Sequence, residues 1–229
     1  MVDILHEEED DEIMVSPAVS ELVTTTKFRS PTAPQPLALT DQEKMDVIAD
    51  RFHDIMEVLG LDMCDPSLAK TPYRVAKMYV TEAFAGLNPK NFPGISFVED
   101  RYQHCERSNI VVVKSNFCSF CEHHFVPFHG VAHVAYLPNG KLIGLSKITR
   151  VVRYFASRPQ LQERLTAQIA DSVSLLLDTD HVAVSITASH DCMIARGIED
   201  HAGTAQTQVL RGDFEHDNTL QNQFFASIK

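Results

Sequence analysis

The stretch Cys118-Ser-Phe-Cys-Glu-His-His124 places two thiols, a carboxylate and two imidazoles within seven residues. Thiol and imidazole groups are the side chains that zinc prefers in proteins. A further imidazole and thiol stand far downstream, in His190-Asp-Cys192. We expect the fold to bring the two segments together around one metal ion.

The spacing of these residues allows more than one set of ligands. Cys118 and Cys121 form a C-x2-C pair, His124 lies three residues beyond the second thiol, and Cys192 offers another. Two thiolates and one imidazole leave a fourth position for water, as in catalytic zinc sites, whereas four protein ligands close a structural site. The residues alone leave both arrangements open.

The composition is that of an acidic protein with enough apolar residues for one compact domain. The 229 residues are 44% hydrophobic, and the formal net charge of −11 argues against general nucleic-acid binding. No apolar run approaches the roughly 18 residues of a membrane span, and the N-terminus lacks a signal-peptide pattern. We therefore expect a cytoplasmic protein with no membrane or nucleic-acid partner, whose five cysteines are reduced, metal-bound or reactive.

Two regions are predicted, a flexible tail over residues 1–39 and a folded domain over residues 40–229. The tail holds eight acidic and two basic side chains, with an acidic run at residues 7–12 and prolines at 31, 34 and 36. Such a segment buries too little apolar surface to offset its ordering entropy. A solvated tail is the expected result.

The folded domain is predicted to be of the α+β class, with helices segregated from an antiparallel sheet. The first helix is expected to start at Thr40, with Glu43 placed for a capping box. Pro138-Asn-Gly140 suits a tight hairpin turn between two strands. The other helices are expected over residues 72–84, 146–157, 159–177 and 218–228. The strands are expected over residues 110–113, 125–137, 141–145, 181–189 and 204–210.

Basic residues suited to bind an anion occur at several places. Lys147 and Arg150 stand one turn apart at the start of a predicted helix, whose N-terminus itself favours negative charge. Arg196 follows the last thiol by four residues, and Arg74 and Lys77 share one face of the second helix. Each of these residues, taken alone, is more typical of a solvated surface charge, so the fold must gather them near the metal to give them a role.

Five motifs, in the order in which they occur, resemble the GTP cyclohydrolase I family. They are Thr71-Pro-Tyr-Arg-Val-Ala-Lys-Met-Tyr79, Cys121-Glu-His-His124, Gly144-Leu-Ser-Lys-Ile148, Arg158-Pro-Gln-Leu-Gln-Glu-Arg-Leu165 and His190-Asp-Cys-Met-Ile-Ala-Arg-Gly197. The resemblance covers about residues 41–228. It implies a tetrahydropterin-type fold with helices on one face of an antiparallel sheet. It also implies a homodecamer of two pentamers, in which the strands close a barrel.

The resemblance also implies a reaction and a cofactor. The family opens the imidazole ring of GTP, releases C8 as formate and forms 7,8-dihydroneopterin triphosphate, with which folate- and pterin-type biosynthesis begins. The implied cofactor is Zn²⁺, bound by Cys121, His124 and Cys192 with water in the fourth position, so that Cys118 stays outside the metal shell. The downstream pathway and the role of the acidic tail are left open.

The remaining site residues are carried over from the same resemblance. His123 and His190 match histidines beside the metal and are the expected proton-transfer groups, while Ser146 matches a serine near the ribose. Glu163 matches a guanine-reading carboxylate, which can accept from both N1–H and the 2-amino group, and Gln162 stands beside it. The expected triphosphate-binding residues are Lys147, Arg150 and Arg196, joined by Arg74 and Lys77 from a neighbouring subunit.

Two alternatives use the same residues differently. A reductase acting on a deazapurine nitrile would need a free nucleophilic cysteine and NADPH, and it would work without metal. A structural zinc or regulatory binding protein would use Cys118, Cys121, His124 and Cys192 in a closed site. That protein would keep its function in the variants His123→Ala and His190→Ala.

Overall fold

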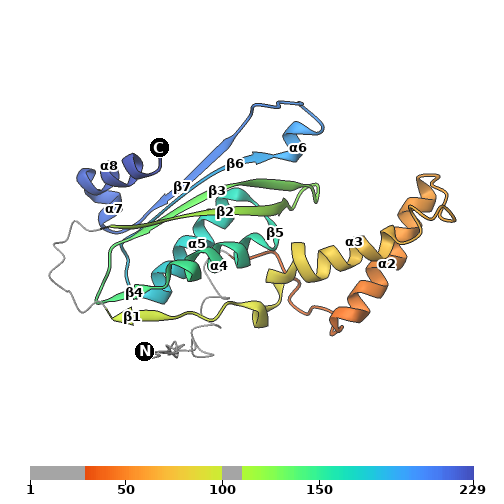
Figure 1. Ribbon diagram of the computed structural model, residues 1–229, viewed down its shortest axis with the longest axis horizontal. Coiled ribbons are helices and arrows are strands. Elements are labelled where there is room, and N and C mark those ends of the chain that lie inside the picture. Colours follow the sequence, from red (N-terminus) through yellow and green to blue (C-terminus); the bar gives the residue numbers. More distant parts are fainter. Residues whose placement is uncertain (1–28, 100–109) are drawn as a thin grey trace, which may run out of the picture.

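The computed structural model describes residues 29–99 and 110–229 (Figure 1). Most of the predicted tail, residues 1–28, and Cys105 lie outside the described residues. Residues 29–40 form neither helix nor strand and are mostly exposed. Within the described ranges, no helix has the length and apolar content needed to cross a bilayer.

Two helices, α2 (Asp41–Val58) and α3 (Thr71–Met78), project from the body as an arm (Figure 1). Thr40 caps α2 as predicted, because its hydroxyl accepts from the Glu43 N–H and the Glu43 carboxylate accepts from the Thr40 N–H. The start of α3 has no side-chain cap. The chain returns to the body through η1 (Tyr79–Ala83), η2 (Ala85–Leu87) and η3 (Pro89–Asn91).

The body is built on a five-stranded mixed sheet, curled into a half-barrel, in the order β5-β2-β3-β6-β7 (Figure 1). All neighbouring strands are antiparallel except β2 and β5, which are parallel, so the prediction of a purely antiparallel sheet is wrong at this edge. The α+β class is confirmed. The strands are β2 (Val111–Cys121), β3 (Pro127–Tyr136), β5 (Pro159–Gln160), β6 (Val182–His190) and β7 (Ala205–Leu210).

Strand β2 is far longer than the apolar run that predicts it. Its buried face continues through Ser115, Phe117, Ser119 and Cys121. Alternate residues of a strand share a face, but two of these four buried residues are serines, which carry no hydrophobic signal. The strand therefore extends directly into the cysteine- and histidine-rich stretch.

The two long helices, α4 (Leu145–Ala156) and α5 (Gln162–Leu177), cover one face of the sheet (Figure 1). The main core lies between them and the strands, with Phe155 and Leu165 packed against residues such as Phe128. Helix α5 starts three residues later than predicted, because residues 159 and 160 form the parallel strand beside β2. Helix α4 starts at Leu145, one residue earlier than predicted.

The opposite face of the sheet carries the C-terminal helices α7 (Asp213–His216) and α8 (Asn218–Ser227). Phe214 and Phe224 pack there against Ala135 and Ala183. These two alanines are register partners, and their side chains point away from the main core because alternate strand residues face opposite sides. The expectation of helices on one face thus holds for the long helices only, whereas the closing helix itself is confirmed.

Strands β1 (Phe97–Glu99) and β4 (Lys141–Ile143) form a separate antiparallel pair. The chain does turn at Pro138–Gly140, where Gly140 has a φ of +72°. The predicted hairpin is wrong, however, because β2 and β6 already occupy both edges of β3. The strand after the turn therefore has to find another partner.

Candidate metal centre

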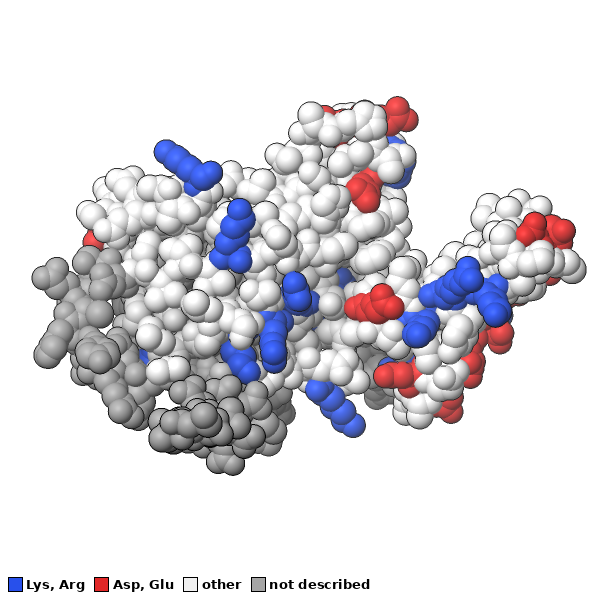
Figure 2. All heavy atoms as spheres, viewed as in Figure 1, with Lys and Arg blue, Asp and Glu red and all other residues white. Residues whose placement is uncertain are grey.

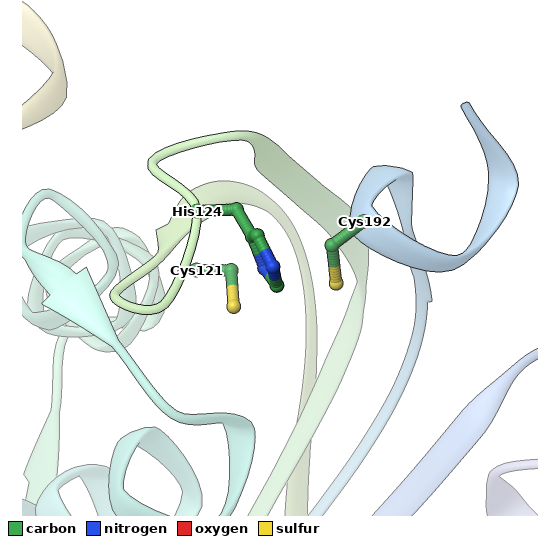
Figure 3. A group of neighbouring side chains, drawn as sticks. All are labelled: Cys121, His124 and Cys192. Atoms are coloured by element: carbon green, nitrogen blue, oxygen red, sulfur yellow. The ribbon is translucent and has the colours of Figure 1, made fainter. Parts of the chain in front are cut away.

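Three of the predicted ligands come together at one edge of the sheet. Cys121 ends β2, His124 lies in the turn to β3, and Cys192 lies in the short helix α6 (Asp191–Ile194) that follows β6. Their sulfur and ring-nitrogen atoms lie within 4.8 Å of one another, and the side chains point into the same space (Figure 3). The topology explains this meeting. Strands β2 and β6 are both antiparallel to β3, so they run in the same direction and their C-terminal ends lie at the same end of the sheet.

The donor set fits a borderline-soft divalent cation. Two thiols and an imidazole are typical zinc ligands, and in the described part of the chain no fourth Cys, His, Asp or Glu joins them. Burial and the neighbouring Cys121 thiol raise the pKa of Cys192. Two thiolates this close together therefore need a bound cation to be stable.

Cys118 does not join the three donors, which we call the metal trio. It lies three positions before Cys121 in the same strand, so the two side chains point to opposite faces of the sheet. Cys118 is exposed as a residue, but partial burial of its thiol raises the pKa of that thiol, with a further contribution from the charge of Asp191. A C-x2-C pair within a straight strand cannot bind one metal ion, which favours the open arrangement.

The turn after β2 is closed by backbone hydrogen bonds and an unusual conformation. The Cys121 N–H donates to the Val126 carbonyl, and the Phe125 N–H donates back to the Cys121 carbonyl, both at 2.9 Å. Phe125 has a φ of +54°, which is uncommon for a bulky residue. Its ring packs against Tyr79 and Phe84 of the returning arm, with centroid distances of 6.3 and 5.3 Å.

Glu122, in this turn, binds Arg164 of helix α5. The carboxylate accepts from Arg164 Nη1 at 2.6 Å and from Nη2 at 3.1 Å, a bidentate contact. Hydrogen bonding from Arg164 lowers the pKa of Glu122, so the carboxylate is ionised. The Glu122 N–H also donates to the Gln160 carbonyl at 3.0 Å, which ties the turn to the strand before α5.

His190 ends β6 beside the metal trio and is held by two contacts. Its ring stacks on Phe128, its register partner, at a centroid distance of 4.6 Å and an angle of 1°. Its Nε2 lies 2.7 Å from Gln162 Oε1. Burial lowers the pKa of His190, although the nearby carboxylates Glu163 and Asp191 act in the opposite direction. The neutral imidazole is thus favoured.

Gln162 is buried at the first position of α5, only 3% exposed. Its amide nitrogen lies 3.1–3.2 Å from three acceptors, the Ile186 and Ala205 carbonyls and the Thr207 hydroxyl. The amide oxygen therefore faces His190, and both ends of the group are occupied within the protein. The sequence places Gln162 beside the guanine-reading carboxylate, but the structure points its amide inward.

The other predicted site residues are distributed around this edge and over the arm. Arg196 donates from Nη1 to His124 Nε2 at 2.9 Å, so one predicted phosphate ligand lies at the metal trio. The side chains of His123, Ser146, Arg150 and Glu163 are exposed. Lys147 is buried, only 7% exposed. Arg150 lines a hollow of about 250 Å³ together with Arg153 and Tyr154.

Arg74 and Lys77 are exposed on α3, and Lys and Arg side chains are visible both on the arm and across the middle of the body (Figure 2). Among the described residues, neither of the two forms a hydrogen bond or ion pair with the metal trio. Within one chain, the structure therefore does not gather these cations at the centre.

Sequence reasoning misses three residues that hold the centre together, namely Glu122, Arg164 and Phe128. The first two lie inside quoted motifs, but no local pattern pairs residues 42 positions apart. The stacking of Phe128 on His190 depends on the register of β3 and β6, which only the fold determines.

Comparison with known proteins gives one consistent result. The profile of the family described as GTP cyclohydrolase I matches residues 48–229. The protein named GTP cyclohydrolase 1 of Aeromonas hydrophila is 47% identical over 192 residues, which cover 84% of this chain and 87% of the relative. The protein of the same name from Vibrio cholerae is 44% identical over 199 residues, covering 86% and 90%. That of Salmonella arizonae is 42% identical over 211 residues, covering 92% and 94%.

Proposed function

Because the chain belongs to the GTP cyclohydrolase I family, we propose that the family's reaction takes place at the metal trio Cys121, His124 and Cys192. The protein is a hydrolase that opens the imidazole ring of GTP and forms 7,8-dihydroneopterin triphosphate. The observation that carries the location of the site is the meeting of two thiols and an imidazole within 4.8 Å at one sheet edge. In this proposal the catalytic domain spans residues 40–229, and residues 1–39 are a tail outside it.

The proposed metal is Zn²⁺, held by the metal trio with an open fourth position. Zinc in such a site supplies Lewis acidity that makes a water molecule nucleophilic near neutral pH. The donor types and the separate face occupied by Cys118 support this assignment. C8 of the purine would leave as formate once both of its bonds to nitrogen are broken.

His190 is the proposed proton-transfer group held most firmly. Because Nε2–H donates to Gln162, Nδ1 carries the lone pair, and it has no hydrogen-bond partner among the described residues. Nδ1 can thus accept a proton and return it in a later step. His123, exposed in the ligand turn, is the proposed second group, and Gln162 acts through His190 in this scheme.

The substrate contacts follow from charge and position. Glu163 presents an exposed carboxylate at the start of α5, where it can accept from the two adjacent donors of guanine. Arg196, Lys147 and Arg150 are the proposed triphosphate ligands, since cationic side chains bind phosphate oxygens by charge-assisted hydrogen bonds. Ser146, exposed in the first turn of α4, is the proposed ribose contact.

A homodecamer of two pentamers in the cytoplasm is the proposed state of the protein. The arm supports assembly, because it exposes apolar side chains that a monomer would leave in water. These are Val47, Ile55, Val58, Leu59 and Leu61. The outer edge of β7 pairs with no other described strand, so a second copy can continue the sheet. Arg74 and Lys77 would then reach the site of a neighbour.

The proposal is tested by measuring formate and pterin released from GTP by the purified protein. Metal content is determined on the same sample before chelation, after chelation and after addition of Zn²⁺. We expect equimolar formate and pterin, lost with the metal and restored by zinc. A folded, zinc-loaded protein that releases neither product would contradict the proposal.

A further inference from the structure

The turn from Cys121 to His124, which carries two of the three metal-trio residues, is held by side-chain contacts on two sides. On one side, Glu122 forms its bidentate contact with Arg164 of α5, and these side chains are only 19% and 18% exposed. On the other side, Phe125 packs into the aromatic pair Tyr79 and Phe84. The turn thus spans the gap between the long helix and the returning arm.

The backbone alone does not explain why this turn keeps its shape. Phe125 has a φ of +54°, a conformation that a bulky residue keeps only when surrounding contacts hold it. The Glu122–Arg164 pair is one of these contacts, because Glu122 lies in the same turn, three residues before Phe125. A bidentate contact fixes the plane of the carboxylate as well as its distance, which a single hydrogen bond or a lysine does not do.

The charge on Arg164 has a second consequence. Glu122 directly follows the metal-trio residue Cys121 in the chain, and a carboxylate is itself a possible zinc ligand. Both carboxylate oxygens bind Arg164, so the charge is paired, and the carboxylate is not among the donors that meet within 4.8 Å. Without the guanidinium, a mostly buried carboxylate would be left unpaired, which is costly.

We propose that Arg164 is a positioning residue for the metal centre. Through Glu122 it fixes the Cys121–His124 turn against α5 and keeps the Glu122 carboxylate out of the metal shell. The inference rests on the proposed metal site, but it concerns how tightly and in what geometry the chain binds the ion. Arg164 itself touches neither metal nor substrate in this account.

Cobalt(II) is the probe that tests this, because its visible absorption reports the geometry and type of its ligands. We expect Arg164→Ala to bind Co²⁺ about 10–100-fold more weakly than the unmodified protein, with altered visible bands. Arg164→Lys keeps the charge but loses the fork, so an intermediate affinity is expected. The control is Lys44→Ala, which removes an exposed cation from its pair with Asp41 and should leave cobalt binding unchanged.

A double-variant cycle separates positioning from general damage. If the two side chains act as one unit, Glu122→Ala combined with Arg164→Ala weakens cobalt binding no more than the worse single variant. Fully additive losses would overturn the proposal. So would a lower melting temperature with unchanged cobalt affinity and spectrum, because that pattern belongs to a purely structural ion pair.

The test keeps its force if Arg164→Ala does not fold. Arg164→Lys and Glu122→Gln preserve the packing volume, and each is then compared with the unmodified protein by the same cobalt titration. Failure of the proposed function is distinguishable, because a normal cobalt spectrum without formate release from GTP contradicts that function alone. Equal cobalt affinity in these two variants and the unmodified protein contradicts the positioning role.

Discussion

Gln162 Oε1 lies 2.7 Å from His190 Nε2, and three acceptors around the Gln162 nitrogen fix which end of the amide faces the ring. A buried amide with a single allowed orientation selects one tautomer of the neutral imidazole. The stacked ring of Phe128 holds the plane of the same histidine. The structure therefore defines the proton on His190 as well as its position.

Replacing the amide should impair catalysis without removing the metal. In Gln162→Leu, which keeps the volume, we expect kcat to fall by about 10–100-fold because the tautomer of His190 is no longer selected. Two carbonyls also lose their donor, which should lower the free energy of unfolding by about 1–3 kcal/mol. Steady-state kinetics, metal analysis and denaturant unfolding check these effects. An unchanged kcat would show that Gln162 does not act through His190.

Substitution of Cys192 and of Cys118 should have opposite effects on zinc content and activity. Cys192→Ser is expected to lose zinc and activity together, since it removes one of three donors. Cys118→Ser should keep both, because its side chain lies on the other face of β2. Metal analysis of both purified variants beside the unmodified protein decides the point. Zinc loss in Cys118→Ser would mean that the ligand set is wrongly assigned.

Glu163 should determine which purine base the enzyme accepts, without affecting how much zinc it binds. Glu163→Gln replaces an acceptor-only group with an amide, and we expect kcat/KM for GTP to fall by about 10–100-fold, the loss of one hydrogen bond to a charged group. Zinc content should not change. Inosine triphosphate lacks the 2-amino donor, so the unmodified enzyme should prefer GTP and the variant should discriminate less. Equal preference in both proteins would remove the guanine-reading role.

Zinc affinity should increase as the pH rises. Burial and Cys121 raise the pKa of the Cys192 thiol, so in the metal-free protein this thiol is still protonated at neutral pH. Metal binding must displace that proton, and apparent affinity should rise up to about tenfold per pH unit for each proton released. Chelator competition between about pH 6 and pH 8 measures the slope, and Cys118→Ser should share it. A flat profile would mean that the thiols are already ionised without metal.

The metal-binding side chains could be predicted from the sequence better than the strands and contacts that hold them in place. Ligand types at Cys121, His124 and Cys192 are a property of the side chains, so the trio is predicted and then found together. The lengths of the strands are harder, because Ser115 and Ser119 are buried without being apolar. The hairpin predicted between β3 and the next strand does not form, because β2 and β6 already pair with both edges of β3.

The contacts that hold the centre are beyond any local pattern. The Glu122–Arg164 pair joins residues that are 42 positions apart, and the His190–Gln162 contact joins residues that are 28 apart. Both depend on the register of strands and on the packing of α5 against them. Nothing in the sequence near either residue indicates its partner.

The exposed arm gives the last prediction, which concerns assembly. Val58 is 88% exposed at the end of α2, so Val58→Asp removes little packing within one chain and should change the free energy of unfolding of the monomer by less than about 0.5 kcal/mol. If a second copy covers the arm, the same change buries an unpaired charge there and should lower the oligomeric state. Activity should fall in parallel, because Arg74 and Lys77 would no longer reach a neighbouring site.

Light scattering coupled to size exclusion measures the mass of the variant. The matched control is Val98→Asp on the body, where the valine is 63% exposed. An unchanged mass in Val58→Asp, with or without loss of activity, would show that the end of this arm is not an interface between copies.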